Sequence, residues 1–126
     1  MKVGDPGSDP YLGKVQRALD VMTRRQTLVA SNVSNLDTPG YRTVDVDFNA
    51  ALADAVAAPD GPPGETAAAR AERVRGLVLR NDGNNVDLDR EMLAMGEVRG
   101  RYEAATAMLR FHVRQLRTAI TEGRTG

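Results

Sequence analysis

Apolar residues near the start of the chain recur at alternating spacings of three and four residues. The run begins at Leu12 and only Gln26 interrupts it, while the charged residues between its members fall mostly off this line. Such a heptad pattern is typical of a helix that packs along a partner helix. It predicts an N-terminal helix within residues 11–37. The seam of this helix consists of Leu12, Val15, Leu19, Met22, Val29, Val33 and Leu36.

A second apolar stripe of the same period runs through the C-terminal part of the chain. Asp87 is a good N-cap residue, acidic side chains follow it, and arginines lie toward the far end, so both ends suit the helix dipole. This pattern predicts a helix within residues 87–122, and residues 123–126 form a tail. The stripe consists of Leu88, Met92, Met95, Val98, Tyr102, Ala105, Leu109, Val113, Leu116 and Ile120.

Residues 38–86 form an irregular middle region in which turn residues separate short elements. Pro39 and Gly40 favour an end to the first helix near Asp37. The elements expected after this break are an extended segment at 41–48, a short helix at 49–58, a linker at 57–73 with room for a turn or two of helix at 67–73, a strand at 74–79 and a hairpin-type turn at 81–85.

Together these elements predict a mainly α fold. Two long terminal helices pair as a coiled-coil-like hairpin, and the irregular middle contains a short helix and a small β-hairpin. Residues 1–10 include two prolines and two glycines, a composition that predicts a disordered tail. Only 4% of the residues are aromatic, and two helices bury one stripe each, so the chain gains stability mainly by association with other subunits.

Composition excludes several functional classes. The 126 residues include no cysteine and one histidine, and the formal net charge is zero. The usual ligands of transition metals are therefore nearly absent, and we expect neither a metal nor another cofactor. A balanced charge gives no general attraction to nucleic acid, and no segment is apolar enough to cross a membrane or to act as a cleaved secretion signal. We expect no nucleic-acid binding and no direct membrane insertion.

Residues that could carry chemistry have simpler interpretations. The single histidine, His112, has no catalytic partner in sequence and is interpreted as a packing or interface residue. Asp45 and Asp47 lie in an alternating segment, where both are expected to face solvent together. Asp87 and Asp89 favour a helix N-terminus without any chemistry. We therefore predict that the chain is not an enzyme.

Three arginines share one face near the end of the C-terminal helix. No glycine-rich phosphate loop precedes them, and acidic residues occupy the same helix. Pairing with acidic residues of other subunits suits their forked side chains better than phosphate binding does. The three are Arg110, Arg114 and Arg117.

The segment from Ala30 to Arg42 resembles the N-terminal signature of bacterial flagellar axial proteins. Two asparagines three residues apart, Asn32 and Asn35, end a heptad helix that runs into a breaker tetrapeptide. This family places paired terminal helices in the core of a tubular polymer. The resemblance implies an interface role for the two asparagines, although local capping is the alternative. For Tyr41, the last residue of the tetrapeptide, a subunit contact is one of two possibilities. The tetrapeptide consists of Thr38, Pro39, Gly40 and Tyr41.

Within these axial proteins the chain is most similar to the B-type subunits of the proximal rod. Residues 45–52 and 82–92 resemble two further motifs of that type, and a middle region of about 50 residues leaves no room for an inserted β-rich domain. The resemblance covers roughly residues 12–121, and the linker carries no motif.

This resemblance implies a structural subunit of the flagellar basal-body proximal rod. Such a subunit polymerises through its terminal helices with copies of itself, with other rod subunits and with the rod-to-base adaptor. It reaches the periplasmic rod through the flagellar type III export apparatus without a cleavable signal peptide. The alternatives are a C-type proximal-rod subunit and a cytoplasmic coiled-coil adaptor or chaperone.

Overall fold

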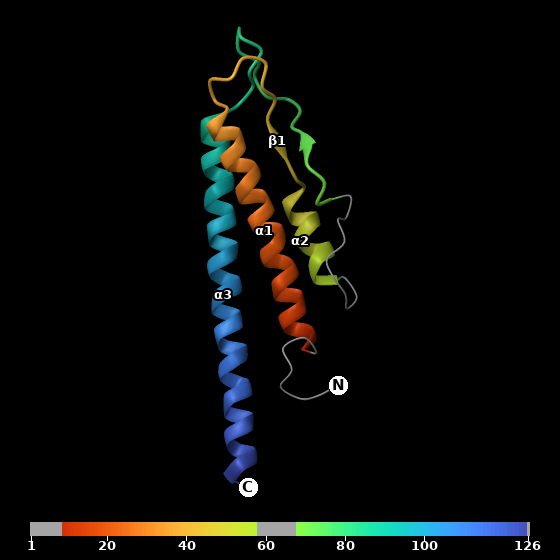
Figure 1. The fold of residues 1–126 in the computed structure, drawn as a ribbon, viewed down its shortest axis with the longest axis vertical. Coiled ribbons are helices and arrows are strands. Elements are labelled where there is room, and N and C mark those ends of the chain that lie inside the picture. Colours follow the sequence, from red (N-terminus) through yellow and green to blue (C-terminus); the bar gives the residue numbers. More distant parts are fainter. Residues whose placement is uncertain (1–8, 58–67, 126) are drawn as a thin grey trace.

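The computed structural model of the chain describes residues 9–57 and 68–125. Helices α1 and α3 run antiparallel side by side, and the short helix and the strands lie along one flank of α1 (Figure 1). The predicted mainly α fold with paired terminal helices is confirmed. Most of the predicted N-terminal tail and of the linker lies outside the described residues. The elements are α1 (Pro10–Ser34), β1 (Val44–Asp45), α2 (Phe48–Ala57), β2 (Glu72–Arg73) and α3 (Leu88–Thr125).

Helix α1 begins and ends at polar side chains. Asp9 is its N-cap and accepts a hydrogen bond from the Tyr11 amide at 2.9 Å, and Pro10 follows in the first turn, where its missing N–H costs nothing. The helix ends at Ser34, earlier than the predicted stop near residue 37. The reason is Asn35, which leaves helical geometry and whose side-chain amide donates to the Ser31 carbonyl at 2.8 Å.

The core lies between α1, α2 and α3. Ala18, Met22, Phe48 and Val98 form its buried cluster. Helix α2 begins at Phe48, one residue before the predicted start, because Asp47 caps it: its carboxylate accepts from the Ala50 amide at 3.3 Å.

The buried line of α1 differs from the predicted seam. Met22 and Val29 belong to both, but Arg25 is buried in place of Gln26, and Asn32 in place of Val33, which is 39% exposed. The line still has a spacing of three and four residues, so the helix keeps the predicted period and is rotated slightly about its axis. This rotation brings two polar side chains inside because both find partners there.

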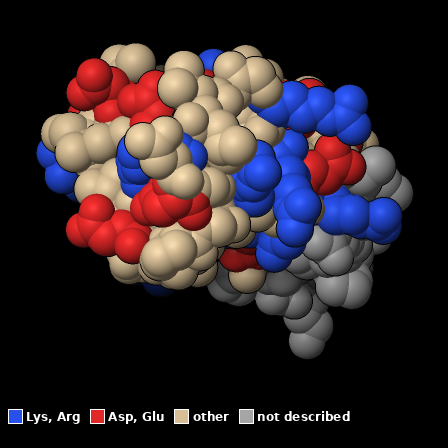
Figure 2. Space-filling model, turned by 90° about the horizontal axis from the view of Figure 1, so that it is seen from above, with Lys and Arg blue, Asp and Glu red and all other residues tan. Residues whose placement is uncertain are grey.

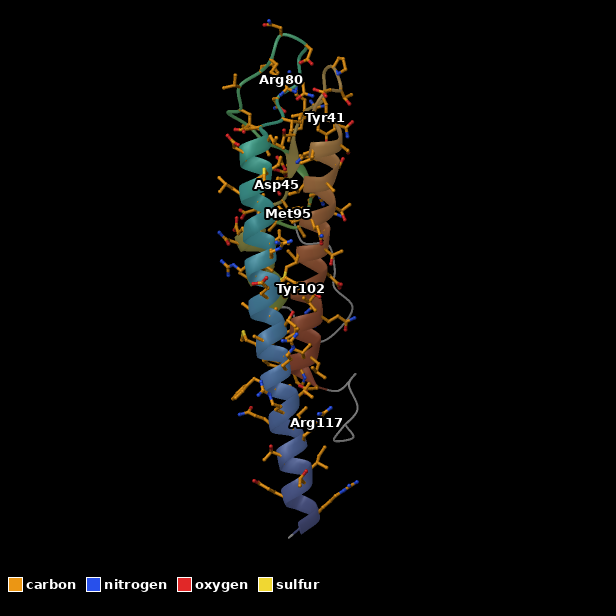
Figure 3. The ribbon with its side chains drawn as sticks, turned by 90° about the vertical axis from the view of Figure 1, so that its left-hand side faces the viewer. Tyr41, Asp45, Arg80, Met95, Tyr102 and Arg117 are labelled. Carbon is orange, nitrogen blue, oxygen red and sulfur yellow. The ribbon has the colours of Figure 1, made fainter. Side chains whose placement is uncertain are left out.

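The predicted stripe of helix α3 is buried only in part, and its exposed members lie near the start, in the middle and toward the end of the helix. Val98 is buried, and Ala105, Leu109 and Val113 are half-buried. Beyond His112, which contacts the start of α1, the helix continues over residues 113–125, or about 20 Å at 1.5 Å per residue. Arg117 lies on this extension, hereafter the α3 overhang (Figure 3). The stripe residues that are exposed are Leu88, Met92, Tyr102, Leu116 and Ile120.

The two strands pair antiparallel, with Val44 opposite Arg73 and Asp45 opposite Glu72. A two-stranded antiparallel sheet was expected, but its predicted position is wrong, since residues 74–79 form no strand and the turn at 81–85 joins none. The helical turns considered for residues 67–73 are also absent from the part that is described. The pairing is instead long-range, and it is extended by a hydrogen bond from the Val74 amide to the Thr43 carbonyl at 2.9 Å.

Candidate functional site at the helix junction

Asn32 connects three elements through one side chain. Its Nδ2 donates to the Val44 carbonyl at 2.8 Å and to Glu91 Oε2 at 3.1 Å. Its Oδ1 accepts from the Tyr41 hydroxyl at 2.8 Å and from the Val44 amide at 3.2 Å. All four hydrogen-bonding positions of the amide are filled. Asn32 therefore fastens the end of α1 to β1, to α3 and to the breaker tetrapeptide.

Asn35, the second asparagine of the motif, acts locally. Besides its bond to Ser31, its Oδ1 accepts from the Thr38 hydroxyl at 3.0 Å. The sequence presents the two asparagines as equivalent, whereas the structure makes Asn32 a link between elements and Asn35 a cap. An interface role for either residue stays a prediction.

The breaker tetrapeptide packs against a second turn through glycine. The Gly40 amide donates to the Asp82 carbonyl at 2.9 Å, and Gly40 and Gly83 both have positive φ, at 75° and 82°. A Cβ atom on Gly83 would lie 3.4 Å from the Gly40 Cα. Both the backbone conformation and the close approach therefore favour glycine at these two positions.

The two asparagines after Gly83 hold the two turns together. The side chain of Asn84 is fully buried and donates to the carbonyls of Asn35 and Thr38 at 2.9 and 2.8 Å. Asn85 accepts from the Thr43 amide at 2.6 Å. Residues 31–44 and 80–91 thus form one unit, hereafter the junction.

Arg80 also links the two segments of the junction. Its guanidinium donates to the carbonyls of Val86, at 3.0 Å, and Leu36. Tyr41 and Arg80 lie at the same end of the molecule, at the connections between α1 and α3 (Figure 3). Sequence reasoning gave Arg80 no role, and it interpreted Asn84 and Asn85 as part of a hairpin-type turn and of the motif at residues 82–92. The sequence feature that could have indicated their role in the junction is the pair of adjacent asparagines, because a hairpin turn does not require two side-chain amides.

A charged cluster lies beside the junction. Buried Asp45 is 3.3 Å from Arg25 Nε and 2.8 Å from a terminal nitrogen of Arg90, and Arg90 also pairs with fully buried Glu91 at 3.0 Å. The Arg25 guanidinium lies 4.5 Å from the centre of the Phe48 ring. The expectation that Asp45 and Asp47 face solvent together is wrong for Asp45, because the arginine on α1 and the one on α3 meet at its carboxylate.

The environment of Arg90 favours the charged form of its guanidinium. Burial alone would lower the pKa of this guanidinium, but its bonds to Asp45 and Glu91 outweigh burial and raise the pKa above the ordinary value. The cluster is therefore a set of mutually paired charges.

Replacing Asp45 with alanine is expected to lower the free energy of unfolding by about 2 kcal/mol. Arg25 and Arg90 would lose a shared partner, but Arg25 keeps Glu97 at 3.1 Å and Arg90 keeps Glu91, which limits the cost. Urea unfolding followed by circular dichroism measures the change. Asp54→Ala removes the same charge from an exposed position and should change stability by less than about 0.5 kcal/mol. Equal effects of the two substitutions would refute the role of the cluster.

His112 joins the start of α1 to α3. Its Nε2 lies 2.9 Å from Asp9 Oδ2, and its ring stacks on Tyr11 with 4.1 Å between centroids. Of the two roles considered for His112, packing or interface, the structure shows packing against the start of α1. The hydrogen bond from His112 lowers the pKa of the Asp9 carboxyl below its ordinary value of 3.8, although desolvation opposes the shift.

Acidification should release this contact. Because the pKa of Asp9 is lower in the folded chain, the stabilisation that it provides is complete above pH 3.8 and is lost as the pH falls through the folded-state pKa. A carbon-detected NMR titration of the Asp9 carboxyl should give a midpoint below 3.8. In His112→Ala the midpoint should rise toward the ordinary value, and an unchanged midpoint would show that another group sets the pKa.

The three arginines of the predicted interface, Arg110, Arg114 and Arg117, are exposed on α3. Their pairing with other subunits stays a prediction. Within the described ranges no group of three or more histidine, cysteine or acidic side chains is placed to hold a metal ion, and no helix is long and apolar enough to span a bilayer.

The geometry defines a class of protein: a helical hairpin whose chain reversal is locked by buried amides and whose long helices carry apolar stripes that their own chain covers only in part. Known proteins are similar to this chain in sequence. The chain is 34% identical to the flagellar basal body rod protein FlgB of Cereibacter sphaeroides, over 90% of this chain and 96% of that protein. It is 27% identical to the FlgB proteins of Escherichia coli K12, over 91% and 96%, and of Borrelia hermsii, over 82% and 90%.

The chain belongs to the family of flagellar basal body rod proteins FlgB. No protein-family model matches the sequence. The family resemblance identified from the asparagine and tetrapeptide motif is confirmed by these relatives.

Proposed function

We propose that the chain is a structural subunit of the flagellar basal-body rod and that it assembles through its terminal helices. The observation that carries this proposal is the incomplete burial of the helical stripes in a chain that belongs to the FlgB family. Leu116 and Ile120 on the α3 overhang and Val33 near the end of α1 are exposed. Apolar stripes of this kind gain stability when a second helix covers them.

Copies of the same chain and other rod subunits are the partners that fit these stripes. Arg114 and Arg117 flank the stripe on the α3 overhang and would pair with acidic side chains of the neighbouring subunit. The subunit acts as a mechanical element, and no step of catalysis is assigned to it.

We further infer that the subunit is exported through the flagellar type III apparatus, joins the rod-to-base adaptor and the other rod subunits, and works in the periplasmic rod. The absence of cysteine supports passage to the periplasm without disulfide formation. In this rod, α1 would serve as the first axial helix and α3 as the second axial helix, with the region between them as the connection.

Deletion of the gene tests the proposal. Cells without it should assemble membrane rings that lack a rod, as seen by electron microscopy of purified basal bodies, and should not swim. A plasmid copy should restore both rod and swimming. Rods that form normally in the deletion strain, with the protein recovered only from the cytosol, would favour a coiled-coil adaptor instead.

A further inference from the structure

We propose that the outer edge of β2 and the arginines beside it form a docking site for an extended acidic peptide, which adds to the sheet as a third strand. The proposal concerns a surface on the opposite side of the sheet from Asn32. It does not depend on assembly of the helices, so its test is separate from that of the proposed function.

The hydrogen-bonding pattern of the sheet leaves the edge of β2 open. In an antiparallel pair, residues that exchange main-chain hydrogen bonds alternate with residues whose N–H and C=O point away from the partner strand. The bond from the Val74 amide to the Thr43 carbonyl identifies these two residues as a hydrogen-bonded pair. The next pair along the strands, Val44 and Arg73, is therefore of the other kind, and its main-chain N–H and C=O groups point outward. The main chain of Arg73 therefore faces away from β1.

The outer edges of β1 and β2 differ in whether their main-chain groups are hydrogen-bonded. On β1, the Asn32 side chain takes both the N–H and the C=O of Val44, as a third strand would. On β2, the sheet has no further strand within residues 9–57 and 68–125. An unpaired strand edge of this kind is a template for an added strand.

Charge specifies what would bind there. Beside β2 is an open groove of about 820 Å³ whose lining includes Arg42, Arg73 and Arg75, and Glu72 is the single acidic side chain among the described residues that line it. The three arginine side chains are exposed. Seen from the junction end, basic side chains gather on the side of the molecule that carries the sheet in Figure 1, while acidic ones are more numerous on the other side (Figure 2). A chain of zero net charge thus presents a locally basic surface.

The occupant is therefore an extended segment with acidic residues at alternating positions. Alternate side chains of a strand share one face, and Arg73 and Arg75 are two residues apart, so one run of acidic side chains can pair with both across the strands. Leu77, which also lines the groove, gives an apolar contact for a side chain between the acids.

Fluorescence anisotropy with the full-length chain tests the proposal. The probe is a labelled peptide of about six alternating glutamate and valine residues, a common strand length. We expect saturable binding that weakens about tenfold or more in Arg73→Glu/Arg75→Glu, whose two side chains are exposed, because attraction becomes repulsion. The matched control Arg99→Glu/Arg124→Glu makes the same charge change at two exposed positions of α3 that do not line the groove, and should bind as the wild type does. Circular dichroism verifies that both variants are folded, and Arg75→Gln, with a smaller expected loss, replaces the double variant if that one unfolds.

A second peptide separates strand addition from simple charge attraction. Methylation of alternate backbone nitrogens removes the N–H groups that pair with β2 and leaves the charges, so binding should fall about tenfold or more. Equal binding of the methylated peptide would overturn strand addition. Equal loss in both arginine variants, or no saturable binding to the wild type, would overturn the site itself.

Discussion

Replacement of Asn32 with alanine is expected to lower the free energy of unfolding by about 3 kcal/mol. The substitution leaves the outward N–H and C=O of Val44 without their partner and removes one donor from Glu91, whose side chain is 0% exposed. Water cannot easily replace the amide there, because Asn32 is itself fully buried. Urea unfolding followed by far-ultraviolet circular dichroism measures the loss.

Asn35→Ala is the matched control for this substitution. The same side chain is removed three residues away, but only a local cap is lost, so the expected cost is about 1 kcal/mol or less. A large loss in both variants would mean that the whole motif acts as one cap. A small loss in both would show that the bonds of Asn32 contribute little to the fold.

Replacement of Ile120 with aspartate is expected to abolish rod assembly and swimming while leaving the subunit folded. Ile120 is 56% exposed on the α3 overhang, so the substitution should change the stability of the free chain by less than about 0.5 kcal/mol. In a helix interface the same carboxylate would be buried without a partner, at a cost of several kcal/mol per contact. Electron microscopy of basal bodies and motility in soft agar measure the result.

Ile120→Val keeps an apolar side chain at the same position and should support normal rods. Val33→Asp tests the other end of the hairpin in the same way, since Val33 is 39% exposed. Leu109 is half-buried within the chain, so an aspartate there would confuse misfolding with failed assembly. Normal rods in both aspartate variants would refute the assignment of these stripes to subunit contacts.

The helices could be predicted from the sequence because their apolar period is carried by many residues. Both long helices and the short α2 lie within a few residues of their expected positions. The rotation of α1 could not be predicted, because an apolar pattern counts Val33 as interior and Asn32 as exterior. Only the partners of Asn32, on β1 and α3, make its burial favourable, and those partners come from distant parts of the chain.

The sheet and the junction show the same limit more strongly. Each strand has two residues, too few for an alternating pattern, and the pairing of Val44 with Arg73 spans α2 and the linker. Local turn chemistry at residues 81–85 favoured a hairpin. The side chains of Asn84 and Asn85 are used instead to bind the loop after α1, a tertiary demand that no local pattern contains.

The α3 overhang gives the subunit a direction. Because α1 begins level with His112, the last residues of α3 project from one end only, while the opposite end is closed by the junction. A filament joined through these projecting tips has two unlike ends: one presents bare helix tips and the other presents locked chain reversals. Such a polymer is polar, as a heterologous contact requires, and an incoming subunit finds a different surface at each end.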